Sequence, residues 1–496
     1  MSLFAAAPAA PAVLPTLQSN APFRTPPAVD GVANPLAELV LPPADGKVLR
    51  PGDAGFDDFL PFNLRTATRP LAVAQCLTAN GVSLAIKWAR RHQVPLCAHA
   101  GGHSYEGFSS CAGLLIDVRK MDSITIDTAS QTARLGAGCL LGNVATALFA
   151  KKLALPAGSC RPVGVSGLTL GGGHGLTARK FGLTCDSLLF ARVVMADGSV
   201  VNASANEHPD LFWALRGGGG GNFGIVTEFT FKVHPVDHVI AFSISWPDDS
   251  FRTAIIRAWQ NLAKGAPDEL SFLLHVNGGQ GKINHLGCSG LYLPRQASQT
   301  PSLEELKTLL APLLSLGNPG FHPHEYSYLD SVKFFAGDGD YDRVFFKGKS
   351  DYVQELWPDA TIQAFITAVR ACASPVATIL EAYGGAIGRV GAAETAFPHR
   401  GDTLFCLQYY LQWRTSAATN GNVAALRALY AAMRTYLPGY SYVNYIDADL
   451  PNFARAYYKD NLPRLQAIKG QYDPDNFFHF AQSIPLPATT DGTHLV

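Results

Sequence analysis

The sequence predicts an α+β protein of two domains, and three features lead to this fold class. Its 496 residues exceed the length that one hydrophobic core usually supports. Segments with the period of a helix are mixed with short apolar segments that are typical of strands. Glycine clusters are confined to residues 99–224, and glycine becomes sparse beyond Pro235. We therefore expect a glycine-rich first domain and a second domain of longer strands and helices.

The first domain is expected over residues 56–235, after an N-terminal extension of residues 1–55 that is rich in proline and alanine. A helix is indicated by four apolar residues at helical spacing: Val82, Ala85, Ile86 and Ala89. The segment VPLCAHA follows as a strand. Three more strands, GLLIDV, SITID and TARLGAG, precede a helix in LGNVATALFAKK.

The rest of the first domain begins with a β-hairpin in ARVVMADGSVVNAS (191–204). Asp197 and Gly198 can supply the two positive φ angles of a type I′ turn between its strands. The helix HPDLFWALR has a proline near its first turn and stops at five consecutive glycines. The strand IVTEFTFKV, with alternating apolar and more polar residues, then completes the domain.

The second domain is expected over residues 236–435, with an antiparallel sheet built from strands such as VIAFSISW, LSFLLHVN and LFCLQYYLQW. The last segment, residues 436–496, contains the helical sequence YYKDNLPRLQAIKGQY. We expect this helix to pack on the first domain, so that residues 436–496 form its C-terminal part.

The charge balance excludes several classes of partner. The chain has 39 basic and 39 acidic residues and a pI near 7.2, so we expect no nucleic-acid partner. No apolar run reaches the ~20 residues of a membrane span, so we expect no membrane partner. The start, MSLFAAAPAAPAVLPTLQ, lacks the basic residues of a secretory signal. We expect a cytoplasmic protein, without excluding secretion, and its nine scattered cysteines are typical of reduced thiols.

Three glycine clusters indicate a ligand site: HAGGHSYEG (99–107), GLTLGGGHG (167–175) and RGGGGGNFG (216–224). Glycine has no Cβ, so it lets a ligand approach the backbone and leaves amides to bind phosphate or carbonyl oxygens. Any one cluster can be explained as a set of tight turns. Three clusters within about 125 residues favour a large ligand that is contacted along its length.

Two other motifs resemble known ligand-binding signatures but lack features that those signatures require. Gly219, Gly221 and Gly224 fit G-x-G-x-x-G, but the dinucleotide fingerprint needs a strand before it and a helix after it. Here the order is reversed, so we exclude a Rossmann fold and a nicotinamide cofactor. The segment GDGDYD (337–342) begins like a calcium loop, but Arg343 and Lys349 replace the required glycine and glutamate. We expect a solvated turn there and no metal site.

A histidine and a cysteine flank the first two glycine clusters. Taken alone, His103 is more often structural, and Cys160 is as readily a small buried apolar residue. A thiolate and an imidazole are also nucleophiles that can bond covalently to an electrophilic cofactor. Their joint placement beside glycine segments suited to one ligand favours that second interpretation.

Five motifs, in this order, resemble the berberine bridge enzyme-like flavoproteins of the vanillyl-alcohol oxidase group. They are PLCAHAGGHSYEG, PAGSCRPVGVSGLTLGGGHG, GGGGNFGIVTEFTFKV, FFKGKSDYV and YDPDNFFHF. The resemblance runs from about residue 60 to residue 485. It implies a two-domain FAD-binding fold with an antiparallel-sheet substrate domain and an active site between the domains.

The resemblance also implies that FAD is bound through two covalent bonds. His103 would bond to the 8α-methyl carbon of the isoalloxazine ring, and Cys160 would bond to C6. Two such bonds are expected to raise the flavin potential and to leave room for an open substrate groove. The further residues implied in FAD binding are Ala100, Gly101, Gly102, Ser104, Gly164, Ser166, Gly167, Gly171, Gly172, Gly173, His174, Gly221, Asn222, Gly224, Ile225, Val226, Asn476 and Phe478.

Five residues match family positions beside the reacting groups. Tyr445, in YVNYIDADL, matches the tyrosine that takes the substrate hydroxyl proton, and Glu381 stands where carbohydrate-oxidising relatives have its carboxylate partner. A phenol with a pKa near ~10 needs such help at neutral pH. Gln408 and Tyr105 match positions on the substrate side. Val163 matches the position that controls access of O2, where valine goes with oxidases, although it can also be a packing residue.

These implications predict an alcohol oxidase in which hydride passes to flavin N5 and O2 is reduced to hydrogen peroxide. A sugar or oligosaccharide lactol is the first candidate substrate, and a secondary-metabolite hydroxyl is the next. Two alternatives stay open: a dehydrogenase of phenolic or secondary-metabolite alcohols with another electron acceptor, and a flavin-binding protein without turnover. Cys406 replaces a lysine of plant relatives, which weakens a monolignol substrate, and His99 and Ala100 replace their usual Arg-Ser or Arg-Gly.

Overall fold

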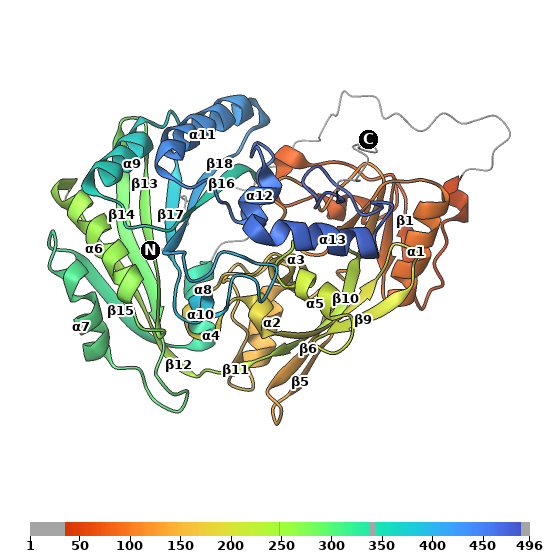
Figure 1. Cartoon of the computed structure of the whole chain (residues 1–496), viewed down its shortest axis with the longest axis horizontal. Helices are drawn as coiled ribbons and strands as arrows, with labels where there is room; N and C mark the ends of the chain where they lie inside the picture. Colours follow the sequence, from red (N-terminus) through yellow and green to blue (C-terminus); the bar gives the residue numbers. More distant parts are fainter. Residues whose placement is uncertain (1–34, 248, 338–342, 488–496) are drawn as a thin grey trace.

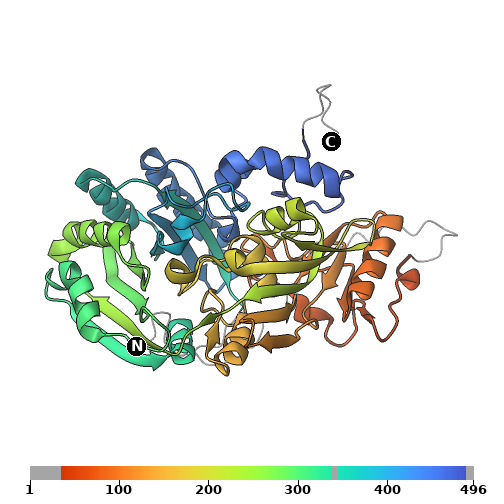
Figure 2. The same cartoon turned by 60° about the horizontal axis from the view of Figure 1, so that its bottom comes forward.

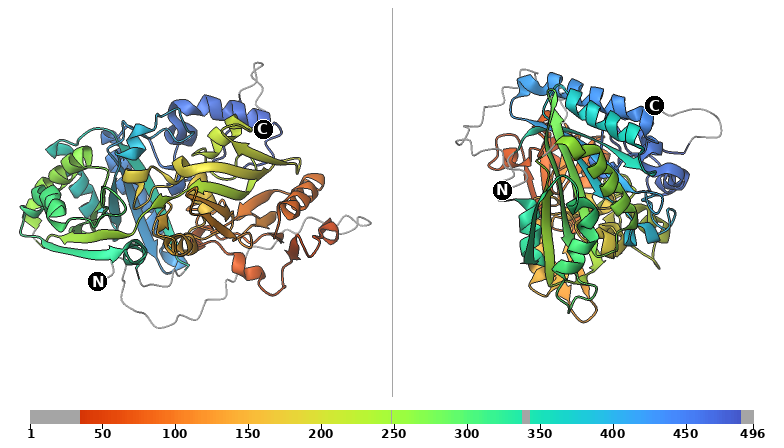
Figure 3. Two further views of the ribbon diagram at one scale, coloured as in Figure 1. Left: turned by 90° about the horizontal axis from the view of Figure 1, so that it is seen from below. Right: turned by 90° about the vertical axis from the view of Figure 1, so that its left-hand side faces the viewer.

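The computed structural model describes residues 35–247, 249–337 and 343–487 (Figure 1). The turn expected in GDGDYD lies, apart from Gly337, outside the described residues. Two small sheets carry the glycine-rich segments, and a seven-stranded sheet lies at the other end of the long axis (Figures 1 and 3). A buried apolar cluster extends through these parts, with members such as Ile86, Phe229 and Trp259. None of the helices in the described residues is long and apolar enough to cross a membrane.

The first sheet has four strands in the order β1-β2-β4-β3. Their bounds are β1 Gly46–Leu49, β2 Ala72–Cys76, β3 Leu96–His99 and β4 Leu114–Asp117. Helix α1 (Ala79–Arg91) joins β2 to β3 and begins at Thr78, whose hydroxyl accepts a hydrogen bond from the amide of Gly81. Its four expected apolar residues are fully buried. Strand β1 lies in the segment assigned to the N-terminal extension, and it pairs with β2 as part of this sheet.

The second sheet has the order β5-β6-β10-β8-β9, and all its neighbouring strands are antiparallel. The bounds are β5 Ile124–Asp127, β6 Thr132–Gly136, β8 Leu188–Val194, β9 Val200–Ser204 and β10 Ile225–Lys232. The predicted hairpin is confirmed, because β8 pairs with β9. The predicted type I′ turn is wrong, because Gly198 has a φ of +79° whereas Asp197 has no positive φ. The Asp197 carboxylate instead accepts a hydrogen bond from the amide of Ser199 at 2.7 Å, within a five-residue loop.

Short helices and one small ladder complete the glycine-rich part. They are α2 Leu141–Phe149, α3 Val165–Leu170, α4 Ala178–Phe181, α5 Pro209–Leu215, and the paired strands β7 Leu153–Ala154 and β11 His234–Pro235. Helix α5 precedes the third glycine cluster and strand β10 follows it. This is the reverse of the order in a dinucleotide-binding βαβ unit, as the sequence predicts.

The third sheet has seven antiparallel strands in the order β15-β12-β14-β13-β17-β18-β16. Their bounds are β12 His238–Ser245, β13 Leu270–Gly279, β14 Lys282–Tyr292, β15 Gly320–Ser327, β16 Phe345–Val353, β17 Ala377–Ala382 and β18 Phe405–Trp413. Four helices lie along one side of it (Figures 1 and 2): α6 Arg252–Gly265, α7 Leu303–Leu314, α9 Asp359–Ala371 and α11 Thr419–Met433. Helices α8 (Tyr328–Ala336) and α10 (Ala386–Arg389) lie nearer the glycine-rich part.

The C-terminal segment returns to the glycine-rich part through α12 (Phe453–Tyr458) and α13 (Leu462–Tyr472), and α13 contacts α5 (Figure 2). Lys469 stabilises the packing of α13 on the glycine-rich part, because its buried ammonium donates hydrogen bonds to the carbonyl oxygens of Asn222 and Phe478. The 3-10 turns are η1 Pro35–Glu38, η2 Phe56–Phe59, η3 Leu64–Thr66, η4 Thr184–Ser187, η5 Asp249–Phe251, η6 Ser416–Ala418, η7 Arg434–Tyr436, η8 Val443–Tyr445 and η9 Lys459–Asn461.

Candidate active site

The three glycine clusters meet in space. Gly101, in the first cluster, and Gly164, three residues before the second, have backbones in contact, because a Cβ on Gly101 would lie 2.3 Å from the amide nitrogen of Gly164. Only glycine permits so close an approach. The amide of Gly219, in the third cluster, donates a hydrogen bond to the carbonyl oxygen of Leu170 at 2.8 Å. The clusters therefore lie side by side, as a single large ligand requires.

His103 lies just after β3 and stacks on Phe62, with ring centroids 4.5 Å apart and an angle of 15° between the rings. Burial, and after it the neighbouring His99, lowers the pKa of His103 to about 4. The imidazole is therefore neutral at pH 7. A neutral imidazole keeps a lone pair and can act as a nucleophile.

Cys160 differs from the other cysteines of the chain. All nine lie in the described residues, and Cys160 alone is exposed. Its carbonyl oxygen accepts a hydrogen bond from the amide of Val163 at 3.3 Å, so a tight turn holds Val163 beside it. Burial, and after it the charge of Cys160, raises the pKa of the Tyr410 phenol. Cys160 thus offers an accessible sulfur.

Tyr445 and Glu381 form a hydrogen-bonded pair, in which the Tyr445 hydroxyl donates to Oε1 of Glu381 at 2.8 Å. Glu381 is 8% exposed, and this burial raises its pKa to about 7, although hydrogen bonds from Tyr445 and Cys406 oppose the shift. Burial, and after it the charge of Glu381, raises the pKa of Tyr445 well above its usual value. A phenol that does not ionise alone therefore contacts a carboxyl group that titrates near neutral pH.

Tyr105 and Gln408 form a second pair beside the first. Nε2 of Gln408 donates a hydrogen bond to the Tyr105 hydroxyl oxygen at 2.7 Å. The ring of Tyr105 stacks on that of Tyr445, with centroids 5.5 Å apart and an angle of 20°. The Tyr105 hydroxyl oxygen accepts the hydrogen bond from Gln408, so the phenolic proton of Tyr105 can be donated to a bound group. The structure thus brings all four predicted catalytic residues together.

The seven-stranded sheet fixes the positions of Glu381 and Gln408. Strand β17 pairs with β18 so that Glu381 lies opposite Cys406 and Ile379 lies opposite Gln408. Opposite residues of antiparallel strands point to the same face, and residues two apart do so too. Tyr105 comes from the loop after β3, and Tyr445 comes from η8 in the C-terminal segment. The site therefore forms where the glycine-rich part meets this sheet.

Part of the second glycine cluster is engaged by the protein itself. The amides of Gly173 and His174 both donate hydrogen bonds to the hydroxyl oxygen of Tyr442, at 3.0 and 3.2 Å. A Cβ on Gly171 would clash with Asn444, and one on Gly172 would clash with Phe397. These four predicted cofactor residues make close contacts with the polypeptide.

The third cluster is also held by internal contacts. The side chain of Asn222 donates to the carbonyl oxygen of Gly218 at 3.1 Å and accepts a hydrogen bond from the amide of Ile484 at 2.8 Å. A Cβ on Gly224 would lie 2.6 Å from Val193. The following residues, Ile225 and Val226, are buried in strand β10, Gly221 has a φ of +75°, and Phe478 is buried.

The remaining predicted residues offer unused polar groups that fit FAD. The backbone amides of residues 101–104 donate no hydrogen bond to any described residue, and free amides of this kind suit a pyrophosphate. A Cβ on Gly167 would meet nothing within 4 Å, so this glycine borders open space. Oδ1 of Asn476 is buried without a hydrogen-bond partner among the residues described. Ser166, in contrast, donates its hydroxyl proton to the carbonyl oxygen of Ala137.

Sequence reasoning missed Tyr410 and a group of buried charges beside Tyr105. The Tyr410 ring lies 6.4 Å from that of Tyr105, at the edge of the site. The buried charges include Lys347 and Asp447, whose side chains are 2% and 1% exposed. The available signal was the motif FFKGKSDYV, in which Lys347, Lys349 and Asp351 alternate along one face of a predicted strand.

Comparisons with known proteins give the family. Residues 70–204 match the FAD binding domain family, and residues 441–485 match the berberine and berberine-like family. An uncharacterized FAD-linked oxidoreductase of Bacillus subtilis (strain 168) is 36% identical over 431 residues, which cover 86% of this chain and 93% of that protein. A monolignol oxidoreductase from Arabidopsis thaliana, named as berberine bridge enzyme-like 13, is 31% identical over 452 residues, and the match covers 84% of both chains. This chain belongs to the berberine bridge enzyme-like family.

A solved structure of a relative agrees with this assignment. Glucooligosaccharide oxidase from Acremonium strictum, whose FAD is 6-S-cysteinyl and 8α-N1-histidyl, has a TM-score of 0.81 and 28% identity to this berberine bridge enzyme-like chain. The match covers 88% of this chain and 97% of that one. The predicted α+β fold of the vanillyl-alcohol oxidase type is thereby confirmed, and the chain is an FAD-linked oxidoreductase.

Proposed function

We propose that this enzyme is an alcohol oxidase whose FAD is bonded covalently to His103 and Cys160. The observation that carries the proposal is the hydrogen bond of 2.8 Å between the Tyr445 hydroxyl and Glu381, beside the stacked Tyr105. This arrangement can remove a proton from a neutral alcohol. The covalent bonds are supported by the neutral imidazole of His103 and the exposed thiol of Cys160. The doubly linked FAD of the Acremonium strictum relative supports them as well.

Tyr445 acts as the base toward the substrate hydroxyl, and Glu381 receives the proton that Tyr445 gives up. The phenol cannot ionise alone at neutral pH because burial raises its pKa. The ionised Glu381 provides the missing acceptor once the pH exceeds its pKa of about 7. Gln408 orients the Tyr105 hydroxyl, whose proton then binds the substrate oxygen. FAD, when bound, supplies the hydride acceptor.

A sugar or oligosaccharide lactol is the proposed substrate class, and a secondary-metabolite hydroxyl is the second. The relation to a glucooligosaccharide oxidase supports the first. Val163, which a tight turn holds beside Cys160, supports O2 as the electron acceptor and hydrogen peroxide as the second product. A dehydrogenase of phenolic alcohols is the alternative, and the monolignol oxidoreductase relative favours it. Cys406, in place of the plant lysine, counts against that alternative.

Peroxide release across a panel of sugars, aryl alcohols and polyketide-like alcohols tests the proposal. We expect one class to bleach the flavin anaerobically and to yield peroxide in air. Tyr445→Phe should slow flavin reduction by about 10²-fold or more while the spectrum of the oxidised flavin stays unchanged. Bleaching followed by slow reoxidation in air would establish the dehydrogenase instead. A flavin that no alcohol bleaches would favour a binding protein without turnover.

A further inference from the structure

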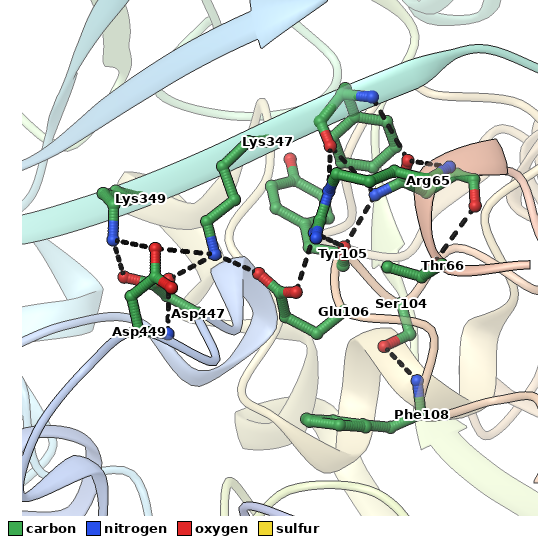
Figure 4. A network of polar contacts seen from close by, with 12 residues as sticks. Arg65, Thr66, Ser104, Tyr105, Glu106, Phe108, Lys347, Lys349, Asp447 and Asp449 are labelled. Carbon is green, nitrogen blue, oxygen red and sulfur yellow. Dashed lines mark hydrogen bonds and ion pairs between the residues drawn. The ribbon is translucent and has the colours of Figure 1, made fainter. Parts of the chain in front are cut away.

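A cluster of buried charges lies beside Tyr105 (Figure 4). We call it the lysine cluster, and it consists of Glu106, Lys347, Lys349, Asp447 and Asp449. The ammonium of Lys347 contacts Oε1 of Glu106 and lies 2.6 Å from Oδ1 of Asp447. The ammonium of Lys349 lies 2.6 Å from Oδ2 of Asp447 and 3.0 Å from Asp449. Both lysine side chains are 2% exposed.

The cost of burying these charges makes stability a poor explanation for the cluster. Each ion loses its hydration, and a buried ion pair often stabilises a fold no better than apolar residues of similar volume. Val353, on the same face of strand β16 as the two lysines, is 1% exposed, so apolar packing is available on that face. A positional role explains why charged residues stand there instead.

Lys347 connects the two segments that carry the stacked tyrosines. Glu106 directly follows Tyr105, and Asp447 is two residues after Tyr445. Lys347 contacts both carboxylates from strand β16, so one ammonium links the loop after β3 to the C-terminal segment.

Further contacts hold each segment in place once Lys347 has joined them. Arg65 donates hydrogen bonds to Glu106 at 2.7 Å and to the carbonyl oxygen of Tyr105 at 3.2 Å (Figure 4). The amide of Asp447 donates to the Tyr457 hydroxyl at 3.0 Å. Glu106 and Asp447 are therefore held together with the backbones of their segments. A shift of either carboxylate would also shift the nearby tyrosine, Tyr105 or Tyr445.

We propose that Lys347 is a positioning residue: its contacts with Glu106 and Asp447 fix the stack of Tyr105 on Tyr445. This inference rests on the proposed function, because the stack sets where Tyr445 stands relative to the substrate hydroxyl and to Glu381. Lys349 provides a matched comparison within the same strand. It is equally buried and contacts Asp447 and Asp449, but it does not contact Glu106.

The test compares Lys347→Met with Lys349→Met. Each variant removes one buried ammonium from β16, so we expect similar losses of melting temperature and unchanged flavin content. In anaerobic stopped-flow measurements at saturating alcohol, the flavin of Lys347→Met should be reduced about tenfold more slowly than that of the wild type. Small misplacements of catalytic groups lower the reaction rate by such amounts. Lys349→Met should stay within about twofold of the wild type, since the link to Glu106 is intact. Equal slowing in both variants would overturn the inference.

Two further measurements separate positioning from a general structural effect. In the Tyr445→Phe background, Lys347→Met should cause no further slowing, whereas an additive effect would contradict a role through Tyr445. Crystal structures should show the Tyr105 and Tyr445 rings unstacked in Lys347→Met and stacked in Lys349→Met. A retained stack in Lys347→Met would refute the inference whatever the activity. If no alcohol reduced the flavin of the wild-type enzyme, the proposed function would fail, but these structures would still decide on Lys347.

Glu106→Gln is a second variant that tests the same inference if Lys347→Met does not fold. It keeps the shape of the side chain and leaves Lys347 paired with Asp447, so the loss of stability should be smaller. We expect slower flavin reduction and a displaced Tyr105 in this variant as well. Wild-type reduction with an intact stack would overturn the inference.

Discussion

Replacing Glu381 by glutamine isolates the proton acceptor of the proposed reaction. Burial raises the pKa of this carboxyl group to about 7, so the ionised form that accepts the Tyr445 proton is lost as the pH falls below that value. At pH 5 only about 1% of Glu381 is ionised, and at pH 8 about 90% is. The wild-type rate of flavin reduction should therefore rise about tenfold per pH unit below 7 and level off above pH 8.

The Glu381→Gln variant should lose this pH dependence. The amide keeps the shape of the carboxyl group but accepts no proton, so we expect a flat profile at a rate about 10²-fold or more below the wild-type plateau. The assay is anaerobic stopped-flow absorbance of the flavin between pH 5 and pH 9 at saturating alcohol. An inflection near pH 7 that persists in Glu381→Gln would refute the reasoning, and so would a wild-type rate that falls as the pH rises.

Cys406→Ala provides a control on the same strand pair. Cys406 lies opposite Glu381 and lowers its pKa through a hydrogen bond. Removing the thiol should therefore move the inflection to higher pH while the plateau rate is kept. A shift toward lower pH would contradict the direction derived from the structure.

Three other predictions concern the cofactor bonds, the acceptor and the fold. After acid unfolding and digestion, the flavin of the wild type should remain on the peptides that contain His103 and Cys160. In Cys160→Ser the flavin should remain on the His103 peptide alone. Flavin released from both peptides would contradict the covalent bonds. Val163→Leu should slow reoxidation in air-saturated buffer severalfold without slowing anaerobic reduction, and unchanged reoxidation would remove Val163 from the path of O2. Lys469→Met should destabilise the protein by about 3–5 kcal/mol in thermal unfolding, because its side chain is fully buried against Asp473. The exposed control Lys264→Met should change stability by no more than about 0.5 kcal/mol, and equal effects would refute the role of the buried ammonium.

Much of the fold followed from local patterns in the sequence. The helical spacing of Val82 and its neighbours predicted α1 because that stripe is fully buried in the structure. The hairpin of β8 and β9 was predictable from apolar strands around Asp197 and Gly198. Its turn type was not, because the Asp197 side chain captures the amide of Ser199 and favours a longer loop.

The candidate site was predictable only in part. Tyr445, Glu381, Gln408 and Tyr105 were named from a family resemblance, and the structure brings them within hydrogen-bonding or stacking distance of one another. The contacts of Lys347 were not predictable, because Glu106 lies 241 residues away from it and Asp447 lies 100 residues away. Neither the hydrophobic periodicity nor the amino-acid composition of the sequence indicates which charged residues form ion pairs across such separations.

The late return of the C-terminal segment has a consequence for the synthesis of this enzyme. Tyr445 and α13 follow the strands of all three sheets in the sequence, and Lys469 bonds to Asn222 across 247 residues of sequence. Contacts so distant along the chain form slowly. A nascent chain can therefore assemble its first two sheets while it still lacks the proton-accepting tyrosine. Under the proposed function, the site therefore cannot act on a substrate before the C-terminal segment has been made and has packed against the glycine-rich part.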